Sequence, residues 1–176
     1  MYKSLSRKTI EAAMQEVANT PQDDAGYLTD QMLEEQPVIL EYLYRLDGLP
    51  FGFDQTIRFS EAEREYILYI GIVVWKALKE SPRPMHSVTW EELDKVVADF
   101  ENFANDLVRQ GHTEIPGAAL LMIENHPEPE LLRFITDAIR PRADDPKFPP
   151  IRPEYRSAAM TVFQIILTAM VGNGEG

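Results

Sequence analysis

The 176-residue sequence contains no cysteine. Disulfide bonds, thiolate nucleophiles and zinc or iron sites with cysteine ligands are therefore excluded. Long hydrophobic runs are also absent. The nearest candidate, residues 158–171, is interrupted by Thr161, Gln164 and Thr168, and it is shorter than the roughly 20 residues that a membrane span needs. We interpret this stretch as a core helix and expect no contact with a membrane.

The sequence also lacks the common catalytic and cofactor-binding motifs. It has no Gly-x-Ser-x-Gly nucleophile elbow and no glycine-rich phosphate loop, and its three histidines are not at metal-ligand spacing. The first residues are basic but contain no continuous apolar stretch, so they do not predict a secretory signal. These observations favour a protein without a cofactor and without enzymatic activity, and the expected location is cytoplasmic.

Positive charge is scarce, with 17 lysines and arginines against 29 aspartates and glutamates and a net charge of -12. Binding to nucleic acid or to an anionic membrane rests on a positive surface. We therefore expect neither as a partner. The simplest interpretation of the acidic excess, much of which falls in residues 21–50, is that it keeps the protein soluble.

What the sequence does contain is helical periodicity along most of its length, which predicts an all-α, single-domain irregular bundle of about seven helices over 1–176. Pro37 is expected to separate two helices within 27–46, because proline suits the first helical position and breaks a helix interior. A proline-rich loop is expected at 140–153 and a frayed tail at 172–176. The expected helices cover 4–19, the two parts of 27–46, 60–81, 90–107, 118–124, a stretch from 127 or 128 to 139, and a last helix that begins at Pro153.

The helix over residues 60–81 is the element around which we expect the bundle to form. Ser60 and Glu63 make a capping box at its start, and Thr89 with Glu92 makes a second one before the helix at 90–107. No charged residue occurs between positions 66 and 75, so the middle of the helix has no polar face. Such a helix is either the buried centre of the domain or half of an interface.

We expect the helices that begin near Trp90 and Tyr155 to pack on this central helix and to cover most of it. One strip then remains as a candidate interface for self-association or for a protein partner, formed by Leu68, Tyr69, Ile72 and Trp75.

A group of basic residues surrounds the proline-rich loop. Guanidinium groups on a stiff loop could receive a carboxylate or phosphate through two hydrogen bonds, which makes the loop a candidate site for an anion or a partner. The alternative is that these side chains pair with acidic residues of the same chain. The residues are Arg140, Arg142, Lys147, Arg152 and Arg156.

Two further features allow other functions. Glu124, His126 and Glu128 are close in sequence, so a carboxylate could orient the imidazole as a base, or the three could help to hold a metal ion. A structural or surface role for His126 is the alternative. The loop at 47–59 carries three phenylalanines, which cover either the core or a small-molecule pocket.

The sequence therefore predicts a non-enzymatic interaction or scaffold domain that self-associates. The alternatives are a metal-dependent enzyme that uses helix-borne carboxylates with His126, and a small-molecule binder under the 47–59 loop. A weak similarity between 32–46 and 122–139 has two explanations, an internal duplication or two instances of a common helix junction.

Overall fold

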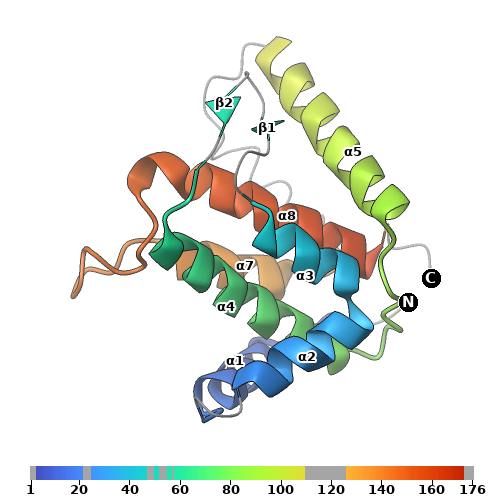
Figure 1. Ribbon diagram of the computed structural model, residues 1–176, viewed down its shortest axis with the longest axis vertical. Coiled ribbons are helices and arrows are strands. Elements are labelled where there is room, and N and C mark those ends of the chain that lie inside the picture. Colours follow the sequence, from blue (N-terminus) through green and yellow to red (C-terminus); the bar gives the residue numbers. More distant parts are fainter. Residues whose placement is uncertain are drawn as a thin grey trace.

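The computed structural model describes residues 3–21, 25–46, 50–51, 55–56, 58–109 and 126–172. This part of the chain forms a bundle of α-helices, which confirms the predicted all-α fold (Figure 1). The expected helix at 118–124 and residues 173–176 of the expected tail lie outside the described ranges. The helices are α1 (Arg7–Ala18), α2 (Ala25–Glu35), α3 (Pro37–Tyr44), α4 (Glu61–Lys79), α5 (Trp90–Arg109), α7 (Pro129–Ile139) and α8 (Arg156–Val171), and the 3-10 turn η2 (Pro153–Tyr155) precedes α8.

One small element was not predicted. Strands β1 (Pro50–Phe51) and β2 (Gln55–Thr56) pair antiparallel, with Pro50 opposite Thr56 and Phe51 opposite Gln55. A two-residue ladder has no room for the alternating pattern that marks a strand in sequence. In the described ranges no helix is both long enough and apolar enough to cross a bilayer.

Both predicted capping boxes are present. The Glu63 amide donates to Ser60 Oγ at 3.2 Å and the Ser60 amide donates to Glu63 Oε1 at 2.7 Å. Thr89 and Glu92 make the same reciprocal pair, at 3.2 and 2.9 Å. Each box satisfies two amide groups that the first helical turn leaves without a partner, which is why these helix starts could be predicted from the sequence.

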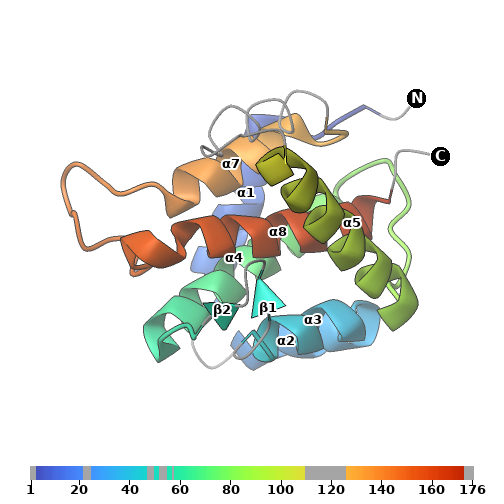
Figure 2. The same cartoon turned by 90° about the horizontal axis from the view of Figure 1, so that it is seen from above.

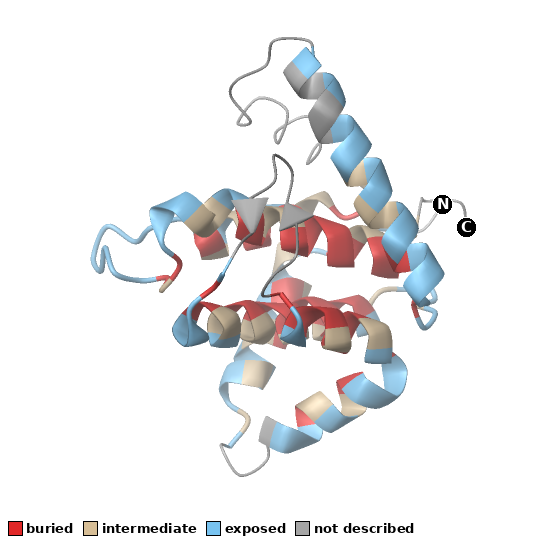
Figure 3. Ribbon diagram, turned by 45° about the horizontal axis from the view of Figure 1, so that its top comes forward, coloured by how far each residue is buried: buried red, intermediate tan, exposed pale blue. Residues whose placement is uncertain are grey.

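The bundle has two central helices, where we expected one. Every residue of α8 from Val162 to Leu167 is buried, most of the middle of α4 is buried as well, and the two helices lie across the centre of the molecule (Figures 1 and 2). Burial coloring shows the same pair as the core (Figure 3). Helix α5 packs against α8, so the expectation that it packs on α4 is wrong; α1 makes the most extensive contact with α4 instead.

Helix α3 packs closely against α4 at Gly71. A Cβ atom added there would lie 2.8 Å from Leu43 Cδ1. The Leu43 side chain, which is buried, therefore occupies the space that a side chain at position 71 would need. This contact sets how closely the two helices can pack.

Helices α3 and α7 begin with the same local arrangement. Each has proline at its first position and a buried cap residue before it, Gln36 at φ -137° and ψ 62° and Glu128 at φ -124° and ψ 69°. Each cap side chain accepts a backbone amide from a distant segment, from Val88 at 3.0 Å and from Leu5 at 2.8 Å. The shared feature is thus centred on Pro37 and on Pro129, which is two residues later than the sequence similarity suggested, and residues 122–125 of that similarity lie outside the described ranges.

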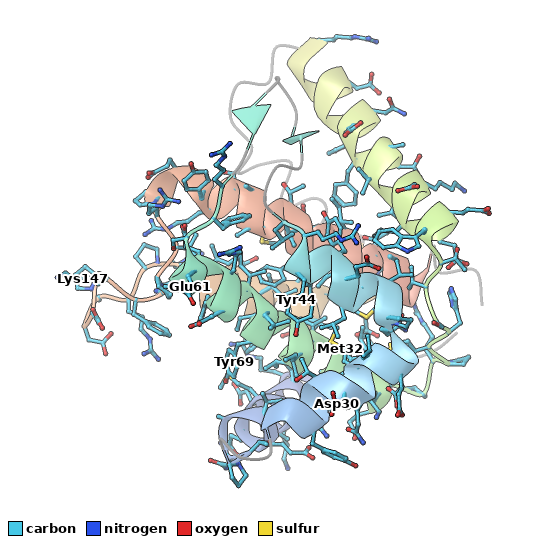
Figure 4. The ribbon with its side chains drawn as sticks, in the orientation of Figure 1. Asp30, Met32, Tyr44, Glu61, Tyr69 and Lys147 are labelled. Carbon is cyan, nitrogen blue, oxygen red and sulfur yellow. The ribbon has the colours of Figure 1, made fainter. Side chains whose placement is uncertain are left out.

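Between α7 and η2, residues 140–152 form no helix or strand, as their prolines predicted. The loop extends from one end of the bundle and carries Lys147 near its tip (Figure 4). It then returns to α4, where the Phe148 ring meets the Tyr66 ring edge-on at 5.4 Å between centroids. The Arg142 amide donates to the Phe148 carbonyl at 3.1 Å, which closes the loop on itself.

Candidate functional site

Three of the four side chains of the candidate interface strip on α4 are half-buried, namely Leu68, Tyr69 and Ile72, and the strip is limited to these three below. Helical spacing places them in line with exposed Glu61 and Glu65 at the start of α4 and with Lys76 and Lys79 at its end. Burial raises the pKa of the Tyr69 hydroxyl. The strip is therefore an apolar surface that the chain covers only in part.

Neighbouring helices border this strip on both sides. On one side Lys76 Nζ pairs with Glu16 of α1 at 3.1 Å, and on the other Lys79 Nζ pairs with Glu35 of α2 at 3.0 Å. Both acidic partners are substantially exposed. The strip therefore lies on α4 between α1 on one side and α2 with α3 on the other.

The inclusion of Trp75 in the candidate interface is wrong, because this side chain is fully buried. The C-terminal end of α2 covers it, and the indole N–H donates to Glu35 Oε2 at 3.0 Å. Lys79 lies over the ring at 4.8 Å from its centroid while it pairs with the same carboxylate. Trp75 therefore belongs to the core, and its polar N–H is satisfied as a buried indole requires.

The neighbouring helices α2 and α3 carry exposed apolar side chains that were missed by the sequence prediction. Tyr27, Leu33 and Tyr44 are 63%, 53% and 57% exposed. Tyr44 and Tyr69 can both be seen in the view of Figure 4. Helical spacing puts Tyr44 on the same face as Leu40, which is buried, so only the position of α3 on α4 shows that Tyr44 faces outward. Leu33 has a signal in the sequence, because Leu28 and Met32 are four positions apart and share one helix face, from which Leu33 points away.

Arg152, one of the five basic candidates, is paired within the chain. Glu63, whose side chain is fully buried, accepts from Arg152 Nη2 at 2.8 Å, from its Nε at 3.1 Å and from its amide at 2.9 Å. Burial alone would raise the pKa of Glu63, but the hydrogen bonds from Arg152 and Ser60 outweigh burial and hold this pKa below 4.5. The Arg152 guanidinium also lies 4.2 Å from the centroid of the Tyr155 ring. This pair anchors the end of the proline-rich loop to the start of α4.

The other basic candidates differ in their surroundings. The Arg142 guanidinium stacks on Phe148 at 4.9 Å from the ring centroid. Arg140 and Lys147 are exposed, and Arg156 is half-buried at the first position of α8. Two of the five, Arg142 and Arg152, thus make contacts that hold the loop in place.

Most residues of the 47–59 loop lie outside the described ranges, so the small-molecule pocket expected under this loop stays a prediction. Phe59, at its end, is buried and its ring centroid lies 5.8 Å from that of Tyr155. A separate open groove of about 270 Å³ lies between α1 and α4. Its charged lining residues are Lys8, Glu16, Lys76 and Glu80, of which Lys76 and Glu16 already pair with each other.

His126 and Glu128 lie where α7 begins, and Glu124 lies outside the described ranges. The Glu128 amide donates to His126 Nδ1 at 3.0 Å, and the buried Glu128 carboxylate accepts the Leu5 amide. Burial and the charge of Arg83 lower the pKa of His126 to about 4. In the described ranges no group of three His, Asp or Glu side chains could hold a metal ion, so the structure identifies no metal ligands at this junction.

Comparison of the chain with family models, with curated proteins and with solved structures found no match. A function therefore has to be argued from the residues and contacts above.

Proposed function

We propose that the protein is a non-enzymatic helical interaction domain that self-associates through a surface formed by α2, α3 and α4. The observation that carries this proposal is the set of large apolar side chains at this surface. Tyr27, Leu33 and Tyr44 are each more than half exposed, and the half-buried strip Leu68, Tyr69 and Ile72 lies between their helices and α1.

The chemistry of this surface matches that of protein interfaces. Tyrosine is enriched in interfaces, since it supplies a large apolar area and a polar hydroxyl while few rotatable bonds have to be ordered. The charged groups lie at the edges of the strip, where Lys76 and Lys79 are already neutralised by Glu16 and Glu35. A partner surface therefore need not bury an unpaired charge, which would cost several kcal/mol.

A protein partner also fits the charge of the chain better than nucleic acid does. The net charge of -12 repels phosphates, and two of the five basic candidates around the proline-rich loop already make contacts within the chain. The cytoplasmic location stays a prediction.

Sedimentation equilibrium of the wild-type protein from about 1 to about 100 µM tests the proposal, because this range brackets a dissociation constant near 10 µM. We expect a reversible shift from monomer to dimer. Tyr44→Glu places a charge on a side chain that is 57% exposed, so the fold should persist while the shift moves to higher concentration.

Phe103→Glu is the matched control, since Phe103 is 41% exposed and lies in the second half of α5, a helix that packs against α8 and is not part of the proposed surface. Association of this variant should equal that of the wild type. A wild-type protein that stays monomeric at 100 µM, or a Tyr44→Glu variant that associates as strongly as the wild type, contradicts the proposal.

A further inference from the structure

Three segments of the chain meet at what we call the N-terminal junction, which consists of Leu5, Arg83, His126 and Glu128. Leu5 belongs to the segment before α1, Arg83 to the connector between α4 and α5, and His126 and Glu128 to the start of α7. The Leu5 amide donates to Glu128 Oε2 at 2.8 Å, and the Glu128 amide donates to His126 Nδ1 at 3.0 Å. The first bond ties the N-terminal segment to the residue that caps α7, and the second fixes the backbone of that same residue against His126.

The second bond requires a neutral imidazole. A backbone amide can only donate, so Nδ1 of His126 has to accept and therefore carries no proton. When the imidazole takes up a second proton, Nδ1 becomes a donor and faces another donor. The bond between His126 and Glu128 cannot persist in that state.

The charges around the junction reinforce this effect. The charged groups that face His126 within the described ranges are Arg83 on the connector and Glu128, whose carboxylate is turned to Leu5. Burial lowers the pKa of His126 and raises the pKa of Glu128, so acid protonates both and places a positive imidazolium within the field of the Arg83 guanidinium.

We propose that the junction is an acid-sensitive latch, in which protonation of His126 releases the start of α7 and the N-terminal segment at Leu5 from the body of the protein. This inference does not depend on the proposed self-association. The opening is local, because the two hydrogen bonds that break join residues at one edge of the bundle. Neither bond involves a residue of α4.

The pH range over which the latch opens follows from the pKa values of His126 and Glu128. A released His126 has an ordinary pKa of 6.5, whereas the latched one has a pKa of about 4, so its contribution to closure is complete above pH 6.5 and is lost as the pH falls toward 4. Glu128 acts in the opposite direction, since a raised carboxyl pKa favours the closed state as the pH falls. The pKa of His126 is the more strongly displaced of the two, so we expect the open fraction to rise by at least about tenfold between pH 7 and pH 4.5.

Amide hydrogen exchange of the full-length protein, measured by NMR and corrected for the intrinsic pH dependence of exchange, tests the proposal. The protection factor of the Leu5 amide should fall by at least about tenfold over this range, in step with the titration of the His126 ring signals. Amides of the α4 core, such as that of fully buried Val74, should keep their protection.

His126→Asn is the decisive variant, because an asparagine side-chain oxygen can accept the amide two residues later but does not titrate. This variant should fold, and its Leu5 amide should stay protected down to pH 4.5. His86→Asn is the control, since His86 is exposed and its ring is hydrogen-bonded to Glu92, outside the N-terminal junction. In this variant the protection factor of the Leu5 amide should fall with pH as it does in the wild type. The proposal is overturned if Leu5 stays protected in the wild type, if its protection falls equally in His126→Asn, or if the core amides lose protection together with Leu5.

Discussion

Glu63 joins the start of α4 to the end of the proline-rich loop. Its carboxylate caps α4 through the Ser60 amide and holds Arg152 at both the guanidinium and the backbone. Its side chain is fully buried, whereas that of Arg152 is 46% exposed. The pair therefore combines a buried, fully hydrogen-bonded carboxylate with a cation that stays partly hydrated, which limits the desolvation cost of the ion pair.

We predict that Glu63→Gln lowers the free energy of unfolding by about 2 kcal/mol at pH 7, because the ion pair with Arg152 is lost and the amide nitrogen replaces an oxygen that accepts from an N–H donor. The lowered pKa of Glu63 means that its contribution is complete above pH 4.5 and is lost as the pH falls through the folded-state value. The difference between wild type and variant should therefore shrink below pH 4.5. Urea unfolding followed by circular dichroism at several pH values measures it.

Glu61→Gln serves as the control for this prediction, since Glu61 is in the same helical turn but exposed (Figure 4). It should change the unfolding free energy by less than about 0.5 kcal/mol at pH 7. Equal effects of the two substitutions would show that the Glu63 contacts with Arg152 contribute no stability of their own.

At the scale of elements, the arrangement of the bundle depends on how closely α3 approaches α4. Two glycines lie in helices of the described part without a positive φ, and they differ in their surroundings. Gly71 meets Leu43 Cδ1, whereas a Cβ atom at Gly26 of α2 would meet nothing within 4 Å. Of these two glycines, only Gly71 lies where packing leaves no room for a side chain.

We predict that Gly71→Val lowers the free energy of unfolding by about 1 to 3 kcal/mol, because the branched side chain and Leu43 compete for the same space. Gly26→Val should be within about 0.5 kcal/mol of the wild type, since valine has a somewhat better helix propensity than glycine and meets no obstacle. Thermal unfolding of both variants measures the difference. If Gly71→Val is no less stable than Gly26→Val, the α3–α4 contact is not tight in solution.

At the scale of the whole molecule, the net charge of -12 opposes self-association. Two copies repel each other, and salt screens this repulsion over a distance of about 8 Å at 0.15 M. The proposed surface relies on apolar side chains, with its lysines already paired within the chain. Added salt should therefore favour the dimer.

We predict that raising sodium chloride from about 0.05 to about 0.5 M strengthens dimerisation severalfold in sedimentation experiments, because the Debye length falls from over 10 Å to under 5 Å. The Phe103→Glu variant, with one more negative charge, should respond at least as strongly. Weaker association at high salt would mean that ion pairs between the copies, rather than apolar contacts, hold them together.

The sequence by itself determined the features that depend on residues three or four positions apart. The capping boxes at Ser60 and Thr89, the break at Pro37 and the absence of helix in the proline-rich loop at 140–152 all follow from local backbone chemistry, and the structure contains each of them. Such features have the same energetics in almost any fold, since their partners are neighbours along the chain. The all-α class follows from the same local periodicity.

Only the tertiary structure decided which helix faces meet. Trp75 became core because α2 crosses it, α5 packed on α8 rather than on α4, and Tyr44 turned outward. Glu63 and Arg152 lie 89 positions apart, and Leu5 and Glu128 lie 123 apart. The sequence indicates that an apolar side chain will be buried or that a charge will be paired, but many other residues could provide the contact. Which residue does so depends on how all the helices pack together.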